Sequence, residues 1–280
     1  MTGETPIPIA LTIAGSDSSG GAGIQADLKT FTALGVYGAS VITALTAQNT
    51  RGVSAIHAVP DSFITAQIDA VADDLRVGAT KTGMLNDGAV VRAVADGVKR
   101  HKLGALVVDP VMVATSGDVL LREDAVEAMC DLLLPLATVI TPNLAEAAYL
   151  LGQSLACDEA QMESQGRALL AFGPKAVLMK GGHGEGADAV DILITHDGAV
   201  LRLSLPRIDT RNTHGTGCTL SAAIAARLAM GDTLEKAVRA AKKFVHAGLV
   251  SAVNQRIGAG SGPVDHLHAL PKSCLQNGCD

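Results

Sequence analysis

Aromatic residues are scarce in this sequence. Phe, Trp and Tyr make up 2% of its 280 residues, and there is no Trp. Single-stranded nucleic acids are bound largely by stacking on aromatic side chains, so the scarcity argues against that class of partner. The sequence also has no Lys/Arg-rich run, and its net charge is −6, so a polyanionic nucleic acid would be repelled overall. With 48% hydrophobic residues, the core must be aliphatic, which suits parallel strands covered by helices on both faces.

Three further absences bear on metal chemistry and on compartment. No C-x-x-C pair occurs among the five cysteines, so neither a structural zinc site nor a thioredoxin-like motif is indicated. No run approaches the roughly 18 apolar residues of a membrane span. Residues 1–8 lack the basic segment and apolar run of a secretory signal. We therefore expect a protein of the reducing cytoplasm that has no membrane partner.

The chain shows no long Pro/Gly/Ser linker, internal repeat or low-complexity tract. We predict one domain over residues 1–270 and a frayed tail over 271–280. Apolar β-prone runs alternate with helical patterns, which predicts an α/β fold with a central, mostly parallel sheet between helices. The predicted strands are Ile7–Ala14, Ser40–Ala47, Ala105–Val108, Val139–Thr141, Ala176–Lys180, Ala189–Thr195 and Ala199–Leu205. The predicted helices are Ile24–Leu34, Ser62–Asp73, Gly88–His101, Ala125–Leu133, Asn143–Leu150, Gln161–Ala171, Thr219–Ala229 and Thr233–Val250. The turn signal His196-Asp197-Gly198 joins the last two strands and predicts an antiparallel edge.

A glycine-rich segment near residue 215 is the most informative motif. Gly215 and Gly217 precede a run without helix breakers, so unpaired backbone N–H groups should point out of the start of a helix. Such a helix start binds anions, and phosphate above all. Cys218 falls at the mouth of this helix, where we expect its thiol to lose a proton more easily than in water. The alternative is that the glycines only shape a tight turn and that Cys218 is a small apolar filler.

A second glycine-rich loop, residues 15–23, follows the first predicted strand. Its Gly21-Ala22-Gly23-Ile24-Gln25-Ala26 matches the G-x-G-x-x-A dinucleotide fingerprint. That fold also needs an acidic residue about 20 positions further on, and none lies between Asp27 and Asp61. A Walker loop fails as well, since Gly21-Ala22 stands where Lys-Ser/Thr is required. The loop therefore indicates a small-ligand site or simply a tight turn.

Charged residues follow three predicted strands, where open α/β sheets place their ligands. Asp109 and Glu146 are hard-oxygen groups that could hold Mg²⁺ through water. Asn143 and Glu146 also have the spacing of a helix capping box, and the two interpretations are compatible. Lys180 ends a buried strand beside glycines and is suited to meet a phosphate, although a solvated lysine is the simpler interpretation.

Other polar residues carry weaker signals. Asp27 is compatible with a plain solvated carboxylate, and Gln48 with a loop cap. His183 and His214 receive no catalytic role, because surface and core histidines are common.

Taken together, these motifs resemble the ribokinase-like superfamily, and closely the hydroxymethylpyrimidine/phosphomethylpyrimidine kinases of thiamine biosynthesis. The matching runs span most of the chain, from about residue 9 to 268. They are 11–30, 41–50, 81–85, 140–143, 180–183 and 212–218. The resemblance implies a ribokinase-like fold, with substrate near the loops that follow the first strands. Sugar kinases of this fold carry an aspartate where this chain has Cys218, and the pyrimidine kinases carry Cys.

The resemblance also implies a pocket for an aminopyrimidine. Gln48 would hydrogen-bond its edge, with Asp27 near the hydroxymethyl side. Met84 and Thr46 would line the ring, and Gly15 would belong to the same substrate site.

For the phosphates, the resemblance implies a second group of residues. Lys180 would bridge the phosphates of ATP, and Asp109 and Glu146 would serve the Mg²⁺ region. Gly215, Thr216 and Gly217 would form the anion hole, with Thr213 beside the nucleotide. Cys218 would act as a base toward the alcohol or only as an N–H donor, and both remain open at this point.

The sequence is accordingly expected to specify an ATP- and Mg²⁺-dependent kinase of 4-amino-5-hydroxymethyl-2-methylpyrimidine and of its monophosphate, and a homodimer. Alternatives are a pyridoxine or pyridoxal kinase, a nucleotide-binding oxidoreductase, and a catalytically silent binding protein. The missing ribose acid disfavours the oxidoreductase. The set of Asp109, Glu146, Lys180 and Cys218 disfavours the silent binder. A candidate loop over the site is Ala114–Asp118.

Overall fold

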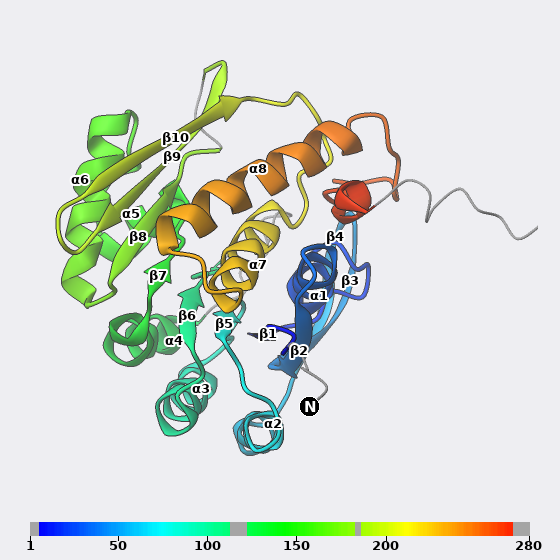
Figure 1. Cartoon of the computed structure of the whole chain (residues 1–280), viewed down its shortest axis with the longest axis vertical. Coiled ribbons are helices and arrows are strands. Elements are labelled where there is room, and N and C mark those ends of the chain that lie inside the picture. Colours follow the sequence, from blue (N-terminus) through cyan, green and yellow to red (C-terminus); the bar gives the residue numbers. More distant parts are fainter. Residues whose placement is uncertain (1–5, 113–121, 183–185, 271–280) are drawn as a thin grey trace, which may run out of the picture.

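A computed structural model describes residues 6–112, 122–182 and 186–270, and its centre is an eight-stranded sheet (Figure 1). The strand order is β10-β9-β8-β7-β6-β5-β1-β2. These strands are β1 Ile9–Ala14, β2 Tyr37–Ile42, β5 Ala79–Thr82, β6 Ala105–Val108, β7 Val139–Ile140, β8 Ala176–Lys180, β9 Asp188–Thr195 and β10 Val200–Pro206. All neighbours from β2 to β8 pair in parallel, whereas β9 is antiparallel to β8 and to β10. The predicted sheet and its antiparallel edge are confirmed.

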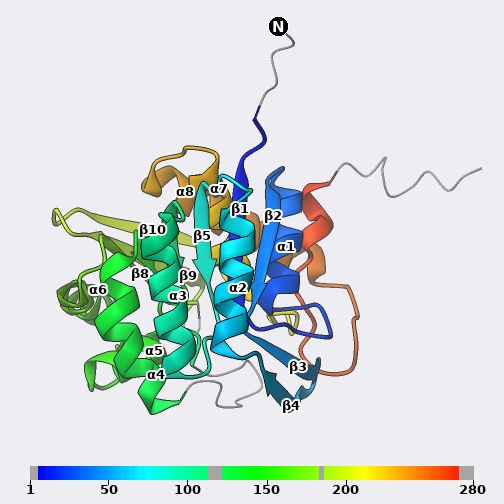
Figure 2. The same cartoon turned by 90° about the horizontal axis from the view of Figure 1, so that it is seen from below.

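Side chains alternate between two hydrophobic layers along the central strands. In β6, for example, Leu106 and Val108 belong to one layer and Val107 belongs to the other. The first layer is covered by α2 Asp61–Ala72, α3 Gly88–His101, α4 Glu123–Ala128, α5 Leu144–Leu151 and α6 Glu159–Leu169. The second layer is covered by α1 Gly23–Ala33, α7 Thr216–Ala229 and α8 Leu234–Ala252 (Figures 1 and 2). The expected helices on both faces are therefore present.

Helix α7 is the element of the second layer that lies over the central strands β1, β5 and β6. Its buried face contains four small side chains, Ala222, Ala223, Ala225 and Ala226, all at 0% exposure, together with Leu220 and Ile224. Small side chains let the helix axis approach the sheet closely. The start of α7 is thereby held against the ends of the central strands.

Three predictions of secondary structure need correction. The predicted strand Ser40–Ala47 is two strands, because the chain leaves β2 at Ile42 and enters β3 Ala44–Asn49. β3 pairs with β4 Gly52–Ala58 in a separate two-stranded sheet, and β4 and β5 were not predicted. The predicted helix Ala125–Leu133 changes at Met129 into a π-helical turn, Met129–Leu133. The predicted start of α7 at Thr219 was three residues late.

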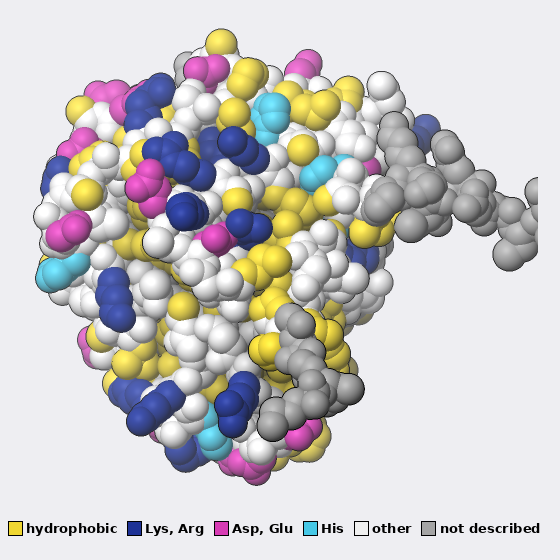
Figure 3. Space-filling view, viewed as in Figure 1, with side chains coloured by type: hydrophobic (Ala, Val, Ile, Leu, Met, Phe, Trp, Pro, Cys, Tyr) yellow, Lys and Arg dark blue, Asp and Glu magenta, His cyan; other side chains and the backbone are white. Residues whose placement is uncertain are grey.

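Two other predictions fall on residues that the structure does not describe. The tail over 271–280 and the candidate loop Ala114–Asp118 lie outside the described residues. Within the described part of the chain, no helix combines the length and apolar character needed to cross a membrane. On the face in Figure 3, Lys and Arg side chains are scattered among acidic and uncharged ones, in keeping with the absence of a basic run in the sequence.

Candidate active site

The carboxyl ends of four parallel strands bring most of the candidate residues to one edge of the sheet. Lys180 is the last residue of β8, and Asp109 directly follows β6. The 15–23 loop follows β1, and Glu146 lies in the first turn of α5, after β7. Adjacent parallel strands end at the same edge, so residues 70 or more positions apart in the sequence become neighbours.

An ion pair forms the centre of this edge. Lys180 Nζ lies 2.8 Å from Asp109 Oδ1 and 3.9 Å from Glu146 Oε2. Asp109 is 1% exposed, and its carboxylate also accepts hydrogen bonds from Thr141 at 3.0 Å and Ser221 at 3.2 Å. Burial alone would raise the pKa of Asp109, but the nearby ammonium groups of Lys180 and Lys81 hold it below its usual range. The carboxylate is therefore kept charged.

The glycine-rich start of α7 reaches this ion pair. A Cβ atom placed on Gly217 would lie 3.3 Å from Lys180 Nζ and 3.8 Å from Asp109 Oδ2. The N-cap residue is Gly215, at φ 76°, and it has no side chain with which to cap the first amides of the helix. The first of those amides, of Thr216, donates to Thr213 O at 3.2 Å, and Gly217, at the positive end of the helix dipole, stands beside the lysine. This combination is well suited to an anionic group such as phosphate.

The capping-box interpretation of Glu146 is confirmed by the local geometry, and its carboxylate also lies near Lys180. Its carboxylate accepts a hydrogen bond from Asn143 N at 2.7 Å, and Asn143 Oδ1 accepts one from Glu146 N at 2.8 Å, which completes the predicted capping box. Burial raises the pKa of Glu146 to about 7, although Lys180 opposes this, and the Asp109 charge raises it further. The carboxylates of Asp109 and Glu146 both lie near the Lys180 ammonium group. Their hard oxygens are a donor set that fits Mg²⁺ bound through water. Among the described residues, no group of three or more His, Cys, Asp or Glu could hold a metal ion.

The expectation for Cys218 was wrong in one respect. The thiol is not easier to ionise in this structure, because burial raises its pKa to about 11 and the Asp27 and Asp109 charges add to the effect. Lys81 and a hydrogen bond with the Gly23 backbone act in the opposite direction but do not prevail. Cys218 is the third residue of α7, so it is placed at the helix mouth as predicted.

Sequence reasoning missed a buried ion pair beneath the site. Lys81 Nζ lies 2.8 Å from Asp27 Oδ2 and 3.1 Å from Oδ1, and both side chains are 0% exposed. Thr12 donates to the same carboxylate at 2.6 Å. Burial alone would lower the pKa of Lys81, but Asp27 outweighs burial and holds the pKa above its usual value. Asp27 is therefore not the solvated carboxylate of the simple interpretation, because it is fully buried.

The signal for Lys81 was present but weak. It lies in β5, whose sequence Ala79-Thr80-Lys81-Thr82 lacks the apolar run of a buried strand. A lysine inside such a strand needs a buried anion, and that requirement is the only trace that the sequence carries.

The expected pyrimidine residues form a second cluster where β3 meets the 15–23 loop. Thr46 Oγ1 donates to Ser16 O at 2.8 Å and lies 3.1 Å from Gln48 Oε1. A Cβ atom on Gly15 would lie 3.2 Å from Met84 Sδ. Gly15, Thr46, Gln48 and Met84 are therefore brought together, with Met84 8% exposed.

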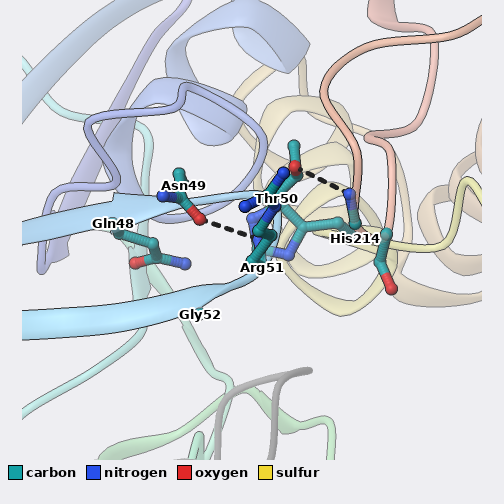
Figure 4. A pocket seen from close by; sticks show the side chains of 8 residues that line it. Gln48, Asn49, Thr50, Arg51, Gly52 and His214 are labelled. Atoms are coloured by element: carbon teal, nitrogen blue, oxygen red, sulfur yellow. Dashed lines mark hydrogen bonds between the residues drawn. The ribbon is translucent and has the colours of Figure 1, made fainter.

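A pocket of about 290 Å³ opens beside this cluster (Figure 4). Its lining comes from the β3–β4 hairpin, from the segment just before α7 and from residues 260–261. The lining residues are Gln48, Asn49, Thr50, Arg51, Gly52, His214, Gly260 and Ser261. Gln48 lies on the strand side of the pocket and His214 lies next to the start of α7. Thr213 is exposed, and its carbonyl accepts a hydrogen bond from Thr216 Oγ1 at 2.6 Å. His183 lies outside the described residues.

Comparisons with known proteins agree with this geometry. The family model "Phosphomethylpyrimidine kinase" matches residues 17–265. A hydroxymethylpyrimidine/phosphomethylpyrimidine kinase of Rhizobium meliloti is 59% identical over 260 residues, which cover 93% of this chain and 97% of that protein. A bifunctional thiamine biosynthesis protein of Geobacter sulfurreducens is 50% identical over 92% of this chain, which spans 52% of that protein. The structure of an ADP complex of Bacillus subtilis pyridoxal kinase superimposes with a TM-score of 0.87 at 37% identity, covering 94% of this chain and 98% of that one. The chain belongs to the phosphomethylpyrimidine kinase family and has the ribokinase-like fold.

The Lys81–Asp27 pair gives a prediction about stability. Lys81→Met leaves the Asp27 carboxylate buried without its cation, and we expect the free energy of unfolding to fall by about 3–5 kcal/mol. The double variant Lys81→Met/Asp27→Leu removes both charges and should recover most of that loss. Urea unfolding followed by circular dichroism measures both variants. A single variant as stable as the wild type would show that the pair is not a buried ion pair.

Glu146 gives a prediction about pH. Its carboxyl holds a proton up to a higher pH in the folded state, with a pKa of about 7, than in the unfolded state, at 4.5. The folded protein therefore binds more protons between these values, and this carboxyl costs stability as pH rises through the window, by up to about 3 kcal/mol.

Glu146→Gln keeps an acceptor for the capping box but cannot titrate. In Mg²⁺-free buffer we expect the variant to gain stability relative to the wild type as pH goes from 4.5 to 8. Urea unfolding at several pH values measures this difference. If it stays constant across the window, the pKa of Glu146 is not raised.

Proposed function

We propose that this member of the phosphomethylpyrimidine kinase family transfers the γ-phosphoryl group of ATP to 4-amino-5-hydroxymethyl-2-methylpyrimidine, and then to the resulting monophosphate, in thiamine biosynthesis. The observation that carries the proposal is the position of the α7 start. Gly217 and Cys218, in its first turn, lie beside the Lys180–Asp109 pair, so an anion site and a side chain able to accept a proton share one place. Phosphoryl transfer to an alcohol needs this combination.

The acceptor would lie against the cluster of Gly15, Thr46, Gln48 and Met84. The carboxamide of Gln48 offers one donor and one acceptor side by side, which suits the amino group and ring nitrogen of an aminopyrimidine. Thr46 lies 3.1 Å from Gln48 Oε1 and orients the amide. Met84 supplies an adaptable apolar contact for the ring. Asp27 is fully buried, so it would influence the hydroxymethyl side only indirectly, through its ion pair with Lys81.

The nucleotide phosphates would lie on the side of Cys218 that faces away from the acceptor, next to Lys180. Lys180 would bridge them, and the amides of Gly215, Thr216 and Gly217 would receive the transferred group, with Thr213 next to the nucleotide. Asp109 and Glu146 would hold Mg²⁺ through water. The ion, when bound, supplies neutralisation of the phosphate charge.

Cys218 is proposed as the base toward the acceptor hydroxyl. A thiolate whose conjugate acid has a pKa of about 11 is a stronger base than one with a pKa near 7, but less of it is ionised at neutral pH. Lys81 favours the thiolate electrostatically from below. Catalysis would then depend on in-line positioning and N–H stabilisation, assisted by proton removal.

One observation favours a second candidate, a pyridoxal kinase. The high TM-score with a structure of that activity comes with extensive coverage of both chains. Pyridoxal and the pyrimidine are both hydroxymethyl heteroaromatics, so the same phosphate site would serve either. We further propose a cytoplasmic homodimer formed by a single domain over residues 1–270.

The substrate assignment is tested by ADP release with Mg·ATP and four acceptors in parallel. These are the hydroxymethylpyrimidine, its monophosphate, pyridoxal and ribose. We expect fast turnover of both pyrimidines, poor turnover of pyridoxal and none of ribose. Pyridoxal as the preferred acceptor would keep the mechanism and replace the substrate, and no turnover at all would defeat the proposed function.

The base role predicts that Cys218→Ala lowers kcat by about 10²–10⁴-fold with little change in KM for the pyrimidine. Steady-state kinetics at pH 8 measures both constants. Cys130→Ala is the control, because Cys130 is also a free cysteine but lies in the π-helical turn after α4. Near-normal turnover of Cys218→Ala would leave only the backbone amide of this residue in the mechanism.

A further inference from the structure

Asp17 is a buried carboxylate that no part of the proposed mechanism uses. It is 1% exposed and lies in the middle of the 15–23 loop. Its carboxylate accepts hydrogen bonds from the amides of Ser19 at 2.8 Å, Gly21 at 3.1 Å and Ala22 at 2.8 Å, and from Ser19 Oγ at 2.7 Å. Ala22 is the N-cap residue of α1, so this one side chain organises the loop and the start of that helix.

A second partner of Asp17 comes from the other end of the sequence. His214 Nε2 lies 2.8 Å from Asp17 Oδ2, and His214 is 6% exposed. Burial alone would raise the pKa of Asp17, but the hydrogen bonds from His214, Ser19 and Ala22 outweigh burial and lower the pKa to about 2. The carboxylate is ionised and can only accept, so His214 Nε2 is the donor.

Backbone contacts support the same connection. A Cβ atom on Gly215 would lie 1.9 Å from Gly21 O, and one on Gly21 would lie 2.4 Å from His214 Cδ2. The Gly215 and Gly21 backbones therefore touch without an intervening side chain, and the His214 ring packs directly on Gly21. His214 is itself fixed, because its N–H donates to Gly262 O at 3.0 Å and its carbonyl accepts from Val264 N at 3.3 Å.

We propose that His214 is a positioning residue, which through Asp17 holds the pyrimidine-side loop 15–23 and the phosphate-side start of α7 in one fixed arrangement. This inference rests on the proposed function, in which these two loops carry the acceptor and the transferred group. The pair joins the segments that precede α1 and α7, two helices that pack against each other. Because in-line transfer tolerates little error in the distance between acceptor and phosphorus, the pair acts on alignment and not on the affinity for either substrate.

The activity test compares His214→Ala with His214→Gln. Alanine removes the donor, and we expect kcat to fall about 10- to 100-fold, with KM for ATP and for the acceptor within about threefold of the wild type. The Gln amide nitrogen can take the place of Nε2 and should restore kcat to within about threefold. The acceptor used is the one that the wild type turns over fastest.

His266→Ala is the matched control. His266 is also buried, at 4% exposure, and also bonds to α7, through Thr219 Oγ1 at 2.9 Å, so its hydrogen bond goes to the helix and not to the 15–23 loop. We expect this variant to lose stability and to keep its kcat at temperatures where it is folded. If His214→Ala keeps kcat within threefold of the wild type, or if both variants lose activity in proportion to stability, the positioning role is overturned.

Hydrogen exchange provides a test that does not depend on the acceptor. In His214→Ala, amides of the 15–23 loop should exchange at least tenfold faster than in the wild type and in His266→Ala. A non-hydrolysable ATP analogue with Mg²⁺ should slow exchange of this loop in the wild type and not in His214→Ala. Unchanged exchange would overturn the inference. A wild type that phosphorylates none of the acceptors would defeat the proposed function and leave this test valid.

Discussion

Buried carboxylates at the carboxyl edge of the sheet impose the constraint on which the rest of this site depends. Asp17, Asp27 and Asp109 are each at most 1% exposed. A charge removed from water is tolerated only where cations or hydrogen-bond donors replace the lost hydration. Asp27 receives Lys81, Asp109 receives Lys180, and Asp17 receives three amides and an imidazole. Each requirement draws a distant segment of the chain to the same edge.

These pairs also determine what the edge can do chemically. Lys180 and Lys81 are each held in place by a carboxylate. Fixed dipoles and charges of this kind stabilise developing charge more effectively than mobile water does. The same surroundings explain the high pKa of Cys218, because burial disfavours the thiolate and the charges of Asp27 and Asp109 add to that effect, against the attraction of Lys81. Phosphate binding at this edge is favoured by the lysines, whereas the neighbouring carboxylates disfavour the Cys218 thiolate that would remove the proton. The same small site therefore contains charges with opposite effects on the two steps.

Much of this arrangement could be predicted from the sequence, and the failures have identifiable physical causes. The alternation of strands and helices, the antiparallel edge and the Asn143–Glu146 capping box follow from local patterns. β5 was missed because its polar sequence is buried by tertiary pairing, which no local pattern reports. The pKa of Cys218 was predicted in the wrong direction, because the helix start is visible in the sequence whereas the packing of Asp27 and Asp109 around it is not. The Asp17–His214 contact joins residues 197 positions apart and left no local signal.

The glycines at the start of α7 serve both interpretations that the sequence left open, a tight turn and an anion-binding loop. Gly215 takes φ 76°, which a residue with a side chain rarely adopts, and its missing Cβ allows contact with Gly21 O. Gly217 likewise leaves open the space next to Lys180. The tight turn is therefore the means by which the amides reach the lysine and the neighbouring loop. A substitution that relaxed the turn would remove the anion site with it, so the structural role and the proposed binding role belong to the same atoms.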